Sequence, residues 1–238
     1  MSTERRDSRE AMLEGAMRLL AESSREHLRR VLTTGAVTAA AGLSRQTFYL
    51  HWSSQADFVD DFVRYVTDPT HSSSSQRLDE IEDDLEEATD DPAEEVRRMS
   101  RRTYRRWAED PVHFARRVLW ATHPNDALVR ARMRELYEAN DEAAAAGFGA
   151  VGDAWGIEPR PPFTLETVAL LFNALRDGLM LQLMIRGDEV PPSFFDDVHL
   201  LLSRAVTRRV GDPDPPDLDE EYRAHVRGEP PVVEGETA

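Results

Sequence analysis

The stretch that decides the fold spans residues 33–58 and reads TTGAVTAAAGLSRQTFYLHWSSQADF. Gly42 suits the left-handed backbone that ends a helix, and Ser44 is a good capping residue for the helix that follows. Thr33 or Thr34 can cap the helix before the glycine in the same way. Two short helices joined by a tight, glycine-containing turn make a helix-turn-helix, which this stretch therefore predicts.

The second helix of this pair carries side chains suited to reading DNA. It would present Arg45, Gln46 and Thr47 at its N-terminal end, the end that enters the major groove in helix-turn-helix proteins. Arginine suits guanine and glutamine suits adenine, each through paired hydrogen bonds, and threonine offers a methyl group to thymine or a hydroxyl to phosphate. Tyr49 and His51 have polar tips suited to phosphates, which set register rather than sequence preference.

Apolar side chains of the same stretch are expected to build the small core beneath the second helix. Phe48 should point inward together with Leu43 and Val37, and Trp52 is also expected to be a core residue. A further helix is expected from Ser54, where aromatic and aliphatic residues recur at spacings of three and four.

This stretch resembles the DNA-binding domain of the tetracycline-repressor (TetR) family of bacterial transcriptional regulators. The matching features are an AGxS turn at 41–44, a T-[FL]-Y sequence at 47–49, His51, the aromatic residue that follows it, and Ser54. The resemblance implies an N-terminal helix-turn-helix domain and a larger helical domain that binds a small-molecule effector. It also implies a homodimer that binds a palindromic operator.

The stretch departs from the family pattern mainly at Gln55, where a lysine is common, so one charged phosphate contact is lost. The N-terminus of that helix could still bind phosphate. The side chains expected at DNA are Thr33, Thr34, Ser44, Arg45, Gln46, Thr47, Tyr49, His51 and Gln55.

The distribution of charge fits a DNA-binding segment at the N-terminus only. The chain of 238 residues has a net charge of −16, yet residues 1–56 hold eight arginines against six acids, a net charge of +2. The remainder therefore carries −18, which repels the DNA polyanion. Every one of the 29 basic residues is arginine, so any phosphate contact from a cationic side chain must come from arginine.

Helical spacing and the lack of strand patterns predict an all-α protein. A first amphipathic helix is expected to begin near Ser8. The predicted domains are a helix-turn-helix domain at 1–68, a ligand-binding and dimerisation domain at 69–210, and an acidic, proline-rich tail at 211–238 without ordered structure. The further helices are expected at about 92–109, 111–122, 125–146, 164–185 and 194–210.

The helix at 164–186 reads TLETVALLFNALRDGLMLQLMIR, and its apolar residues cover more than one face. A helix of this kind must be buried on two sides. One side would face the domain core, and the other would face a partner subunit together with the helix at 194–210. A monomeric core is the alternative explanation.

The candidate ligand pocket consists of large or polar residues on otherwise apolar helices, because aromatic and methionine side chains make adaptable cavities. Each of them could instead be an ordinary core residue. The stronger candidates are Trp107, Phe114, Trp120, His123, Tyr137, Phe172, Asn173, Arg176 and Met180, and the wider set adds Met133, Phe148, Trp155, Asp177 and Met184.

Other features are given structural explanations. The arginine pairs between 97 and 106 should form ion pairs with the acid-rich segment at 79–95, each contributing little. Gly147–Gly152 matches G-x-G-x-x-G, but a predicted helix rather than a strand precedes it, so we reject a dinucleotide site. The absence of cysteine excludes disulfides.

The sequence favours a cytoplasmic regulator with no membrane span, no metal and no cofactor, and no recognised catalytic motif indicates an enzyme. Two alternatives stay open: a dimeric DNA-binding protein that responds to no ligand, and a helical enzyme with an incidental helix-turn-helix.

Overall fold

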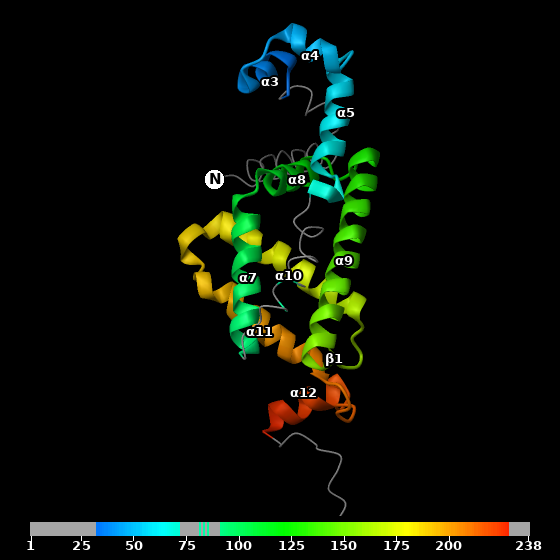
Figure 1. The fold of residues 1–238 in the computed structure, drawn as a ribbon, viewed down its shortest axis with the longest axis vertical. Helices are drawn as coiled ribbons and strands as arrows, with labels where there is room; N and C mark the ends of the chain where they lie inside the picture. The colour runs from blue at the N-terminus through cyan, green and yellow to red at the C-terminus, as the bar shows by residue number, and fades with distance from the viewer. Residues whose placement is uncertain (1–31, 72–80, 82, 84, 86–90, 229–238) are drawn as a thin grey trace, which may run out of the picture. The chain divides into compact units, whose positions relative to one another are not determined.

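A computed structural model of the chain describes residues 32–71, 81, 83, 85 and 91–228, and these residues are almost entirely helical (Figure 1). The helix expected from Ser8 lies outside the described residues. Contacts divide the chain into two compact units. The small unit runs up to Ser75 and adds Arg106–Asn140, and the large unit consists of Gln76–Arg105 and Asp141–Ala238.

The small unit contains the helix-turn-helix. Its elements are α3 (Thr34–Ala41), α4 (Arg45–His51), α5 (Gln55–Val66), the 3₁₀ turn η1 (Pro69–His71), α8 (Pro111–Thr122) and the first part of α9 (Ala127–Trp155). In Figure 1, α3 and α4 lie together at the N-terminal end of α5. One core cluster of the unit joins Phe48 and Phe58 to Val63, Leu119 and Leu136.

The large unit is built on long helices with a cavity between them. Its elements are most of α7 (Pro92–Glu109), the rest of α9, β1 (Ile157–Pro159), α10 (Leu165–Arg186), the 3₁₀ turn η2 (Gly187–Glu189), α11 (Pro192–Val206), β2 (Thr207–Arg209) and α12 (Leu218–Arg227). Val168 and Phe172 of α10 pack with Val206 in a second core cluster. The structure confirms the all-α class.

Helix α9 is longer than the sequence pattern predicted. It continues to Trp155, although the glycine-rich stretch that begins at Gly147 was expected to end it near residue 146. Packing explains the glycines: a Cβ built on Gly152 would lie 2.7 Å from the backbone oxygen of Ile157. The turn of the chain into β1 therefore needs glycine there, and the helical backbone confirms that this segment is no dinucleotide loop.

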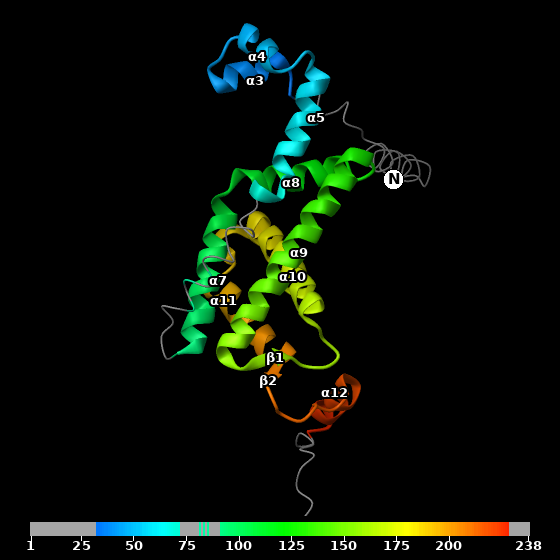
Figure 2. The same ribbon diagram turned by 45° about the vertical axis from the view of Figure 1, so that its right-hand side comes forward.

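Two further features correct the sequence-based expectations. β1 and β2 form a short antiparallel pair in which Ile157 lies opposite Arg209 (Figure 2), although no strand was expected. Three-residue strands are too short to show an alternating pattern. Part of the tail, expected to lack structure, forms α12, which Asp217 caps and Arg160 anchors through a two-pronged ion pair with Glu221.

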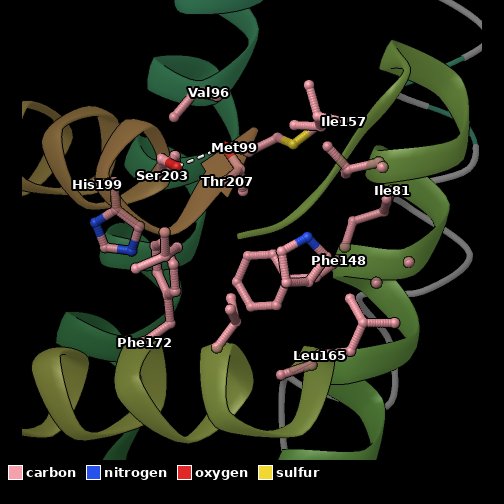
Figure 3. Close-up of a pocket in the computed structure, with 18 of the residues that line it drawn as sticks. Ile81, Val96, Met99, Phe148, Ile157, Leu165, Phe172, His199, Ser203 and Thr207 are labelled. Carbon is pink, nitrogen blue, oxygen red and sulfur yellow. Dashed lines mark hydrogen bonds between the residues drawn. The ribbon is translucent and has the colours of Figure 1, made fainter. Parts of the chain in front are cut away.

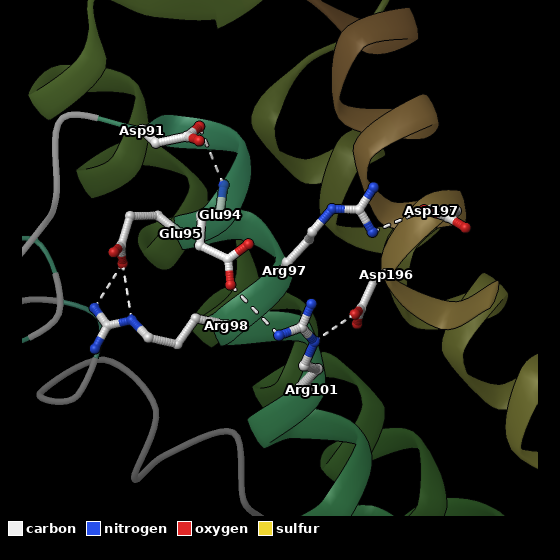
Figure 4. A network of polar contacts seen from close by, with 8 residues as sticks. All are labelled: Asp91, Glu94, Glu95, Arg97, Arg98, Arg101, Asp196 and Asp197. Atoms are coloured by element: carbon white, nitrogen blue, oxygen red, sulfur yellow. Dashed lines mark hydrogen bonds and ion pairs between the residues drawn. The ribbon is translucent and has the colours of Figure 1, made fainter. Parts of the chain in front are cut away.

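The arginines of α7 form ion pairs within the large unit, as expected, but two of the acidic partners that the structure describes, Asp196 and Asp197, lie on α11 (Figure 4). Arg98 pairs with the buried Glu95 at 2.5 Å. Arg101 pairs with Asp196 at 2.7 Å, and this hydrogen bond raises the pKa of Arg101. Arg97 reaches Asp197 at 2.7 Å, so these pairs join α7 to α11.

Helix α10 has two apolar faces, as the sequence predicted. Its buried face includes Phe172, Arg176 and Met180, whereas its opposite face exposes Leu170, Leu181, Met184 and Ile185. By length and composition it is the one helix among the described residues that could cross a membrane. A core helix of a soluble protein passes the same test, so this is weak evidence for a span.

Candidate nucleic-acid interface and cavity

The helix-turn-helix forms through the local contacts that its sequence predicts. The hydroxyl of Thr33 accepts a hydrogen bond from the Ala36 amide at 3.2 Å and caps α3. Gly42 ends α3 with φ of 67°, in the left-handed region. The Ser44 hydroxyl accepts from the Thr47 amide at 3.1 Å and caps α4. Three short-range signals therefore fix both ends of α3 and the start of α4.

The first turns of α4 present the expected polar side chains to solvent. Arg45, Gln46, Tyr49 and His51 are exposed and Thr47 is half-buried. No acidic residue occurs in α4, so nothing on this helix repels a phosphate. The N-terminal end of α4 is thus accessible and free of negative side chains.

Arg45 is held close to α3 in this structure. A Cβ built on Gly35 would lie 2.9 Å from Nη2 of Arg45, so the guanidinium passes directly over this glycine. A larger residue at position 35 would have to displace it. The glycine therefore leaves room for the guanidinium next to α3.

Aromatic packing fixes the face that α4 presents. Phe48 is 3% exposed, and its ring centroid lies 5.0 Å from that of Trp52 and 5.4 Å from that of Phe58. The indole N–H of Trp52 donates to Asp61 at 2.9 Å. The core positions of Phe48 and Trp52 are thereby confirmed, but Leu43 is 58% exposed and was wrongly expected in this core. The backbone of the short turn directs the Leu43 side chain toward solvent.

The start of α5 is less suited to phosphate than the sequence suggested. Gln55 Nε2 donates to the backbone oxygen of Leu32 at 3.0 Å, so this side chain is already engaged near the start of α3. Ser54 accepts from the Asp57 amide and caps the helix. Hydrogen bonds from Ser53 and Ser54 lower the pKa of Asp57, which keeps a negative charge in the first turn.

The other end of α5 is fixed by a buried cation. Arg116 of α8 is 5% exposed, and its Nε donates to the backbone oxygen of Val66 at 2.5 Å while Nη2 donates to that of Asp68 at 3.3 Å. A positive charge there complements the negative end of the helix dipole. Burial lowers the pKa of Arg116, though an arginine remains protonated. A shift of α8 would therefore also displace the C-terminal end of α5.

The large unit contains a cavity of about 240 Å³, and Figure 3 shows its side chains. Four helices and both strands contribute to the lining. Most of the wall is apolar, with Met99 from α7, Phe148 from α9, Ile157 from β1, and Leu165 and Phe172 from α10. Such a wall suits the apolar part of a small molecule.

Polar groups enter this cavity from α10 and α11. Asn173 and Arg176, 4% and 5% exposed, lie one turn apart on α10. Asn173 Nδ2 donates to Asp141 at 2.5 Å, which fixes the amide. His199 lies beside Phe172, and its Nδ1 donates to the Phe195 carbonyl at 2.8 Å. The cavity thus combines an apolar wall with a few fixed polar groups.

The structure brings together only part of the predicted pocket. Phe148, Trp155, Phe172, Asn173 and Arg176 line the cavity. Met180 is buried and Met184 is exposed, and neither of them nor Asp177 lines it. The structure therefore gives these three residues no place in the wall of this cavity.

The remaining candidates lie in the small unit, and none of them is among the residues that line this cavity. Phe114, Trp120 and Tyr137 are exposed, whereas Met133 and His123 are buried. The hydroxyl of Thr122 lies 2.6 Å from His123 Nδ1. The Trp107 side chain lies outside the described side chains. The sequence shows that these residues are large or polar on otherwise apolar helices. It does not show to which of the two units each residue belongs.

Sequence reasoning also missed several lining residues. Met99 and Arg102 come from the arginine-rich α7, and His199, Ser203 and Thr207 come from the last helix and strand. The G-x-G-x-x-G segment was the available signal, because glycines inside a long helix indicate close packing or an opening beside it. Among the described residues, no group of three histidines or carboxylates could hold a metal ion.

Comparisons with known proteins add little. No family model and no curated protein sequence matches the chain. Among solved structures, the chain is similar to SmeT, the repressor of the Stenotrophomonas maltophilia multidrug efflux pump SmeDEF. The TM-score is 0.47 and the identity 14%, over 84% of this chain and 89% of that one. A likeness at this level says nothing of what either chain binds.

Proposed function

We propose that the chain is a TetR-like DNA-binding transcriptional regulator of the cytoplasm, a repressor released from its operator by a small, largely apolar ligand. The observation that carries the proposal is the N-terminal end of α4, where Arg45 and Gln46 are exposed on a helix that Ser44 caps. This end has the side chains and the accessibility that reading a major groove requires.

Packing beneath α4 supports its role as a reading helix. Phe48 and Trp52 anchor the inner face to Phe58 of α5, so the outer face has one fixed orientation. Thr33 and Thr34 at the start of α3, with Ser44, Tyr49 and His51, then serve as the phosphate contacts that set register. Gln55 supports the helix-turn-helix through its hydrogen bond to the backbone oxygen of Leu32 and does not itself contact DNA.

A second copy of the chain is the proposed partner of the outer face of α10 and α11. Leu170, Leu181 and Ile185 lie on one side of α10, and Phe194 and Leu201 lie on one side of α11, all exposed. A two-fold dimer would cover both faces and would place two copies of α4 in successive major grooves, roughly 34–36 Å apart.

Release by ligand follows from linkage between the cavity and α4. Helices α7 and α9 each contribute residues to both units, so a ligand that alters their packing can change α8 and, through Arg116, the end of α5. If the ligand favours a state with the wrong spacing of the two α4 helices, ligand and DNA weaken each other by the same factor. The cavity counts against the alternative in which the large domain serves only dimerisation.

The test is binding to DNA from upstream of its own gene, measured by fluorescence anisotropy at fixed salt. Arg45→Ala should weaken binding by about 1–3 kcal/mol, the free energy of one bidentate base contact. Arg64→Ala, which removes an exposed arginine near the far end of α5, is the matched control and should change affinity little. Equal effects of the two substitutions would refute the role of α4, and the absence of any DNA binding would refute the function.

A further inference from the structure

We infer that the cavity of the large unit binds an uncharged, flat molecule with a bicyclic aromatic body, which lies against Phe148 and Phe172 and over Gly149 of α9. The inference names the ligand class of the regulator proposed above and rests on that function for its regulatory meaning. The binding itself needs no DNA.

The size and the aromatic wall of the cavity define the body of the ligand. Its volume of about 240 Å³ exceeds the roughly 150 Å³ of a cavity that accepts benzene, so it has room for more than one ring. Phe148, Trp155 and Phe172 line it, and the ring centroids of the two phenylalanines lie 4.7 Å apart. Aromatic rings pack favourably on such a surface through stacked or edge contacts. A bicyclic aromatic body therefore suits this wall better than an aliphatic one.

The charged side chains of the described wall favour an uncharged ligand. Glu158 is paired with Arg208 at 2.9 Å, and Asp153 is exposed. Arg102 and Arg176 also line the cavity, and each already interacts with other groups of the protein. An ionic ligand group would therefore have to displace an existing partner or be buried without one, which is strongly unfavourable.

Two glycines of α9 that line the cavity differ in what their packing requires. A Cβ built on Gly152 would lie 2.7 Å from the backbone oxygen of Ile157, so a side chain is excluded there. A Cβ built on Gly149 would lie 3.7 Å from Cδ1 of Leu165, which also lines the cavity, and this is an ordinary van der Waals contact. Glycine inside a helix is less stable than alanine, yet the described packing does not require it at 149. The missing side chain leaves space in the cavity, and the ligand rings fill that space.

The experiment compares four probes that share one bicyclic body and differ in charge or aromaticity. They are 2-naphthalenemethanol, its saturated analogue decahydro-2-naphthalenemethanol, 2-naphthoate and protonated 2-naphthylmethylamine, each titrated into the full chain by calorimetry at neutral pH. We expect 2-naphthalenemethanol to bind tightest. The saturated alcohol should bind roughly two- to ten-fold more weakly, the range for lost aromatic contacts. Both ions should bind at least about ten-fold more weakly, because their charge is buried without a new partner.

Substitutions of Gly149 test where the rings lie. Gly149→Leu places a side chain in the space of the ligand and should weaken 2-naphthalenemethanol at least about ten-fold. It should also raise the melting temperature of the ligand-free chain by roughly 1–4 °C, since leucine favours a helix more than glycine does. A loss of binding together with a gain of stability separates a filled cavity from a damaged fold.

Two further variants complete the series. Ala146→Leu adds the same side chain at an exposed position of α9 that does not line the cavity, and it should change the affinity by less than about two-fold. Gly149→Ala adds only the methyl group that meets Leu165 and should weaken 2-naphthalenemethanol less than leucine does. If Gly149→Leu does not fold by circular dichroism, the alanine variant and the probe series decide.

The inference is overturned if either ion or the saturated alcohol binds as tightly as 2-naphthalenemethanol, or if none of the four binds. It is also overturned if a folded Gly149→Leu chain keeps the affinity of the unaltered chain. Failure of the proposed function would look different. In that case 2-naphthalenemethanol would still bind with the expected preference, while the chain would show no affinity for DNA.

Discussion

The helix-turn-helix and the cavity place polar side chains in opposite ways. On α4, Arg45 and Gln46 are exposed and the apolar Phe48 is buried beneath them. In the cavity, Arg176 and Asn173 are buried inside an apolar wall. A long polymer must be read from an outer surface, whereas a small molecule must be enclosed. The difference matches the two kinds of partner proposed for this chain.

The two regions also differ in how far apart their residues lie in the sequence. The contacts that shape α3 and α4 join residues three or four positions apart, such as Ser44 to Thr47. The cavity joins Met99 to Thr207, which lie on different elements of the large unit. A site of the first kind depends on local geometry, and a site of the second kind depends on the packing of the whole unit.

The largest expected effect tests the core beneath α4. Phe48→Ala should destabilise the small unit by about 3–5 kcal/mol, because it removes a buried aromatic ring that contacts Trp52 and Phe58. Thermal unfolding followed by circular dichroism would show an early transition. Phe172→Ala, at the cavity wall, should enlarge an existing space and cost less. An equal loss for the two substitutions would mean that their surroundings do not differ as described.

The next effect tests the proposed dimer face. Leu201→Glu places a charge on the exposed apolar side of α11 and should raise the dimer dissociation constant at least ten-fold, about 1.4 kcal/mol or more. Sedimentation velocity across a concentration series would measure it. Glu189→Gln, on the exposed turn after α10, is a control that should leave the dimer intact. A monomeric unaltered chain at micromolar concentration would contradict the proposal.

The placement of Arg45 is tested by a substitution with two smaller effects, a gain in helix stability and a loss of DNA affinity. Gly35→Ala should raise helix stability by about 0.5–1 kcal/mol, because alanine favours a helix more than glycine does. It should also weaken DNA binding several-fold, since the added methyl group displaces the Arg45 guanidinium. Gly178→Ala on α10 has open space around its Cβ position and should stabilise without altering DNA affinity. If both variants bind DNA equally well, Arg45 is not held by this contact.

The smallest effect concerns pH and α12. The ion pair with Arg160 lowers the pKa of Glu221 below its usual 4.5, so its contribution is present above that value and is lost as pH falls through the lowered pKa. The contribution of such a half-exposed pair is below about 1 kcal/mol. The protection factors of the α12 amides, that is, exchange corrected for the intrinsic rate at each pH, should fall at acidic pH in the unaltered chain and show less pH dependence in Glu221→Gln. Identical profiles would show that the pair does not hold α12.

The elements that the sequence could predict are those that depend on local contacts, and the elements that it missed depend on distant ones. The bounds of α7 and α8 were predicted within about a residue, and the caps of α3 and α4 at Thr33 and Ser44 were also predicted, because caps and prolines act locally. The exposed polar residues of α4 were predicted in the same way. The end of α9, the β1–β2 pair and α12 were missed, because each depends on a contact with a distant segment, such as that of Gly152 or Glu221.

The candidate pocket shows the limit most clearly. Phe172, Asn173 and Arg176 were found because they are polar or large on an apolar helix. Trp120 and Tyr137 satisfied the same criterion but belong to the small unit, and nothing in their spacing distinguishes the two cases. Side-chain type indicates that a residue can line a cavity, and only packing determines which cavity.

The central claim, that the N-terminal end of α4 reads DNA as one half of a dimer, is tested most directly by selection from a random duplex library. The unaltered chain should enrich a palindromic sequence with half-sites roughly 10–10.5 base pairs apart or a multiple of that. Arg45→Ala should lose the preference at one position of each half-site while keeping the others. Enrichment of no sequence, or of the same sequence by both proteins, would contradict the claim.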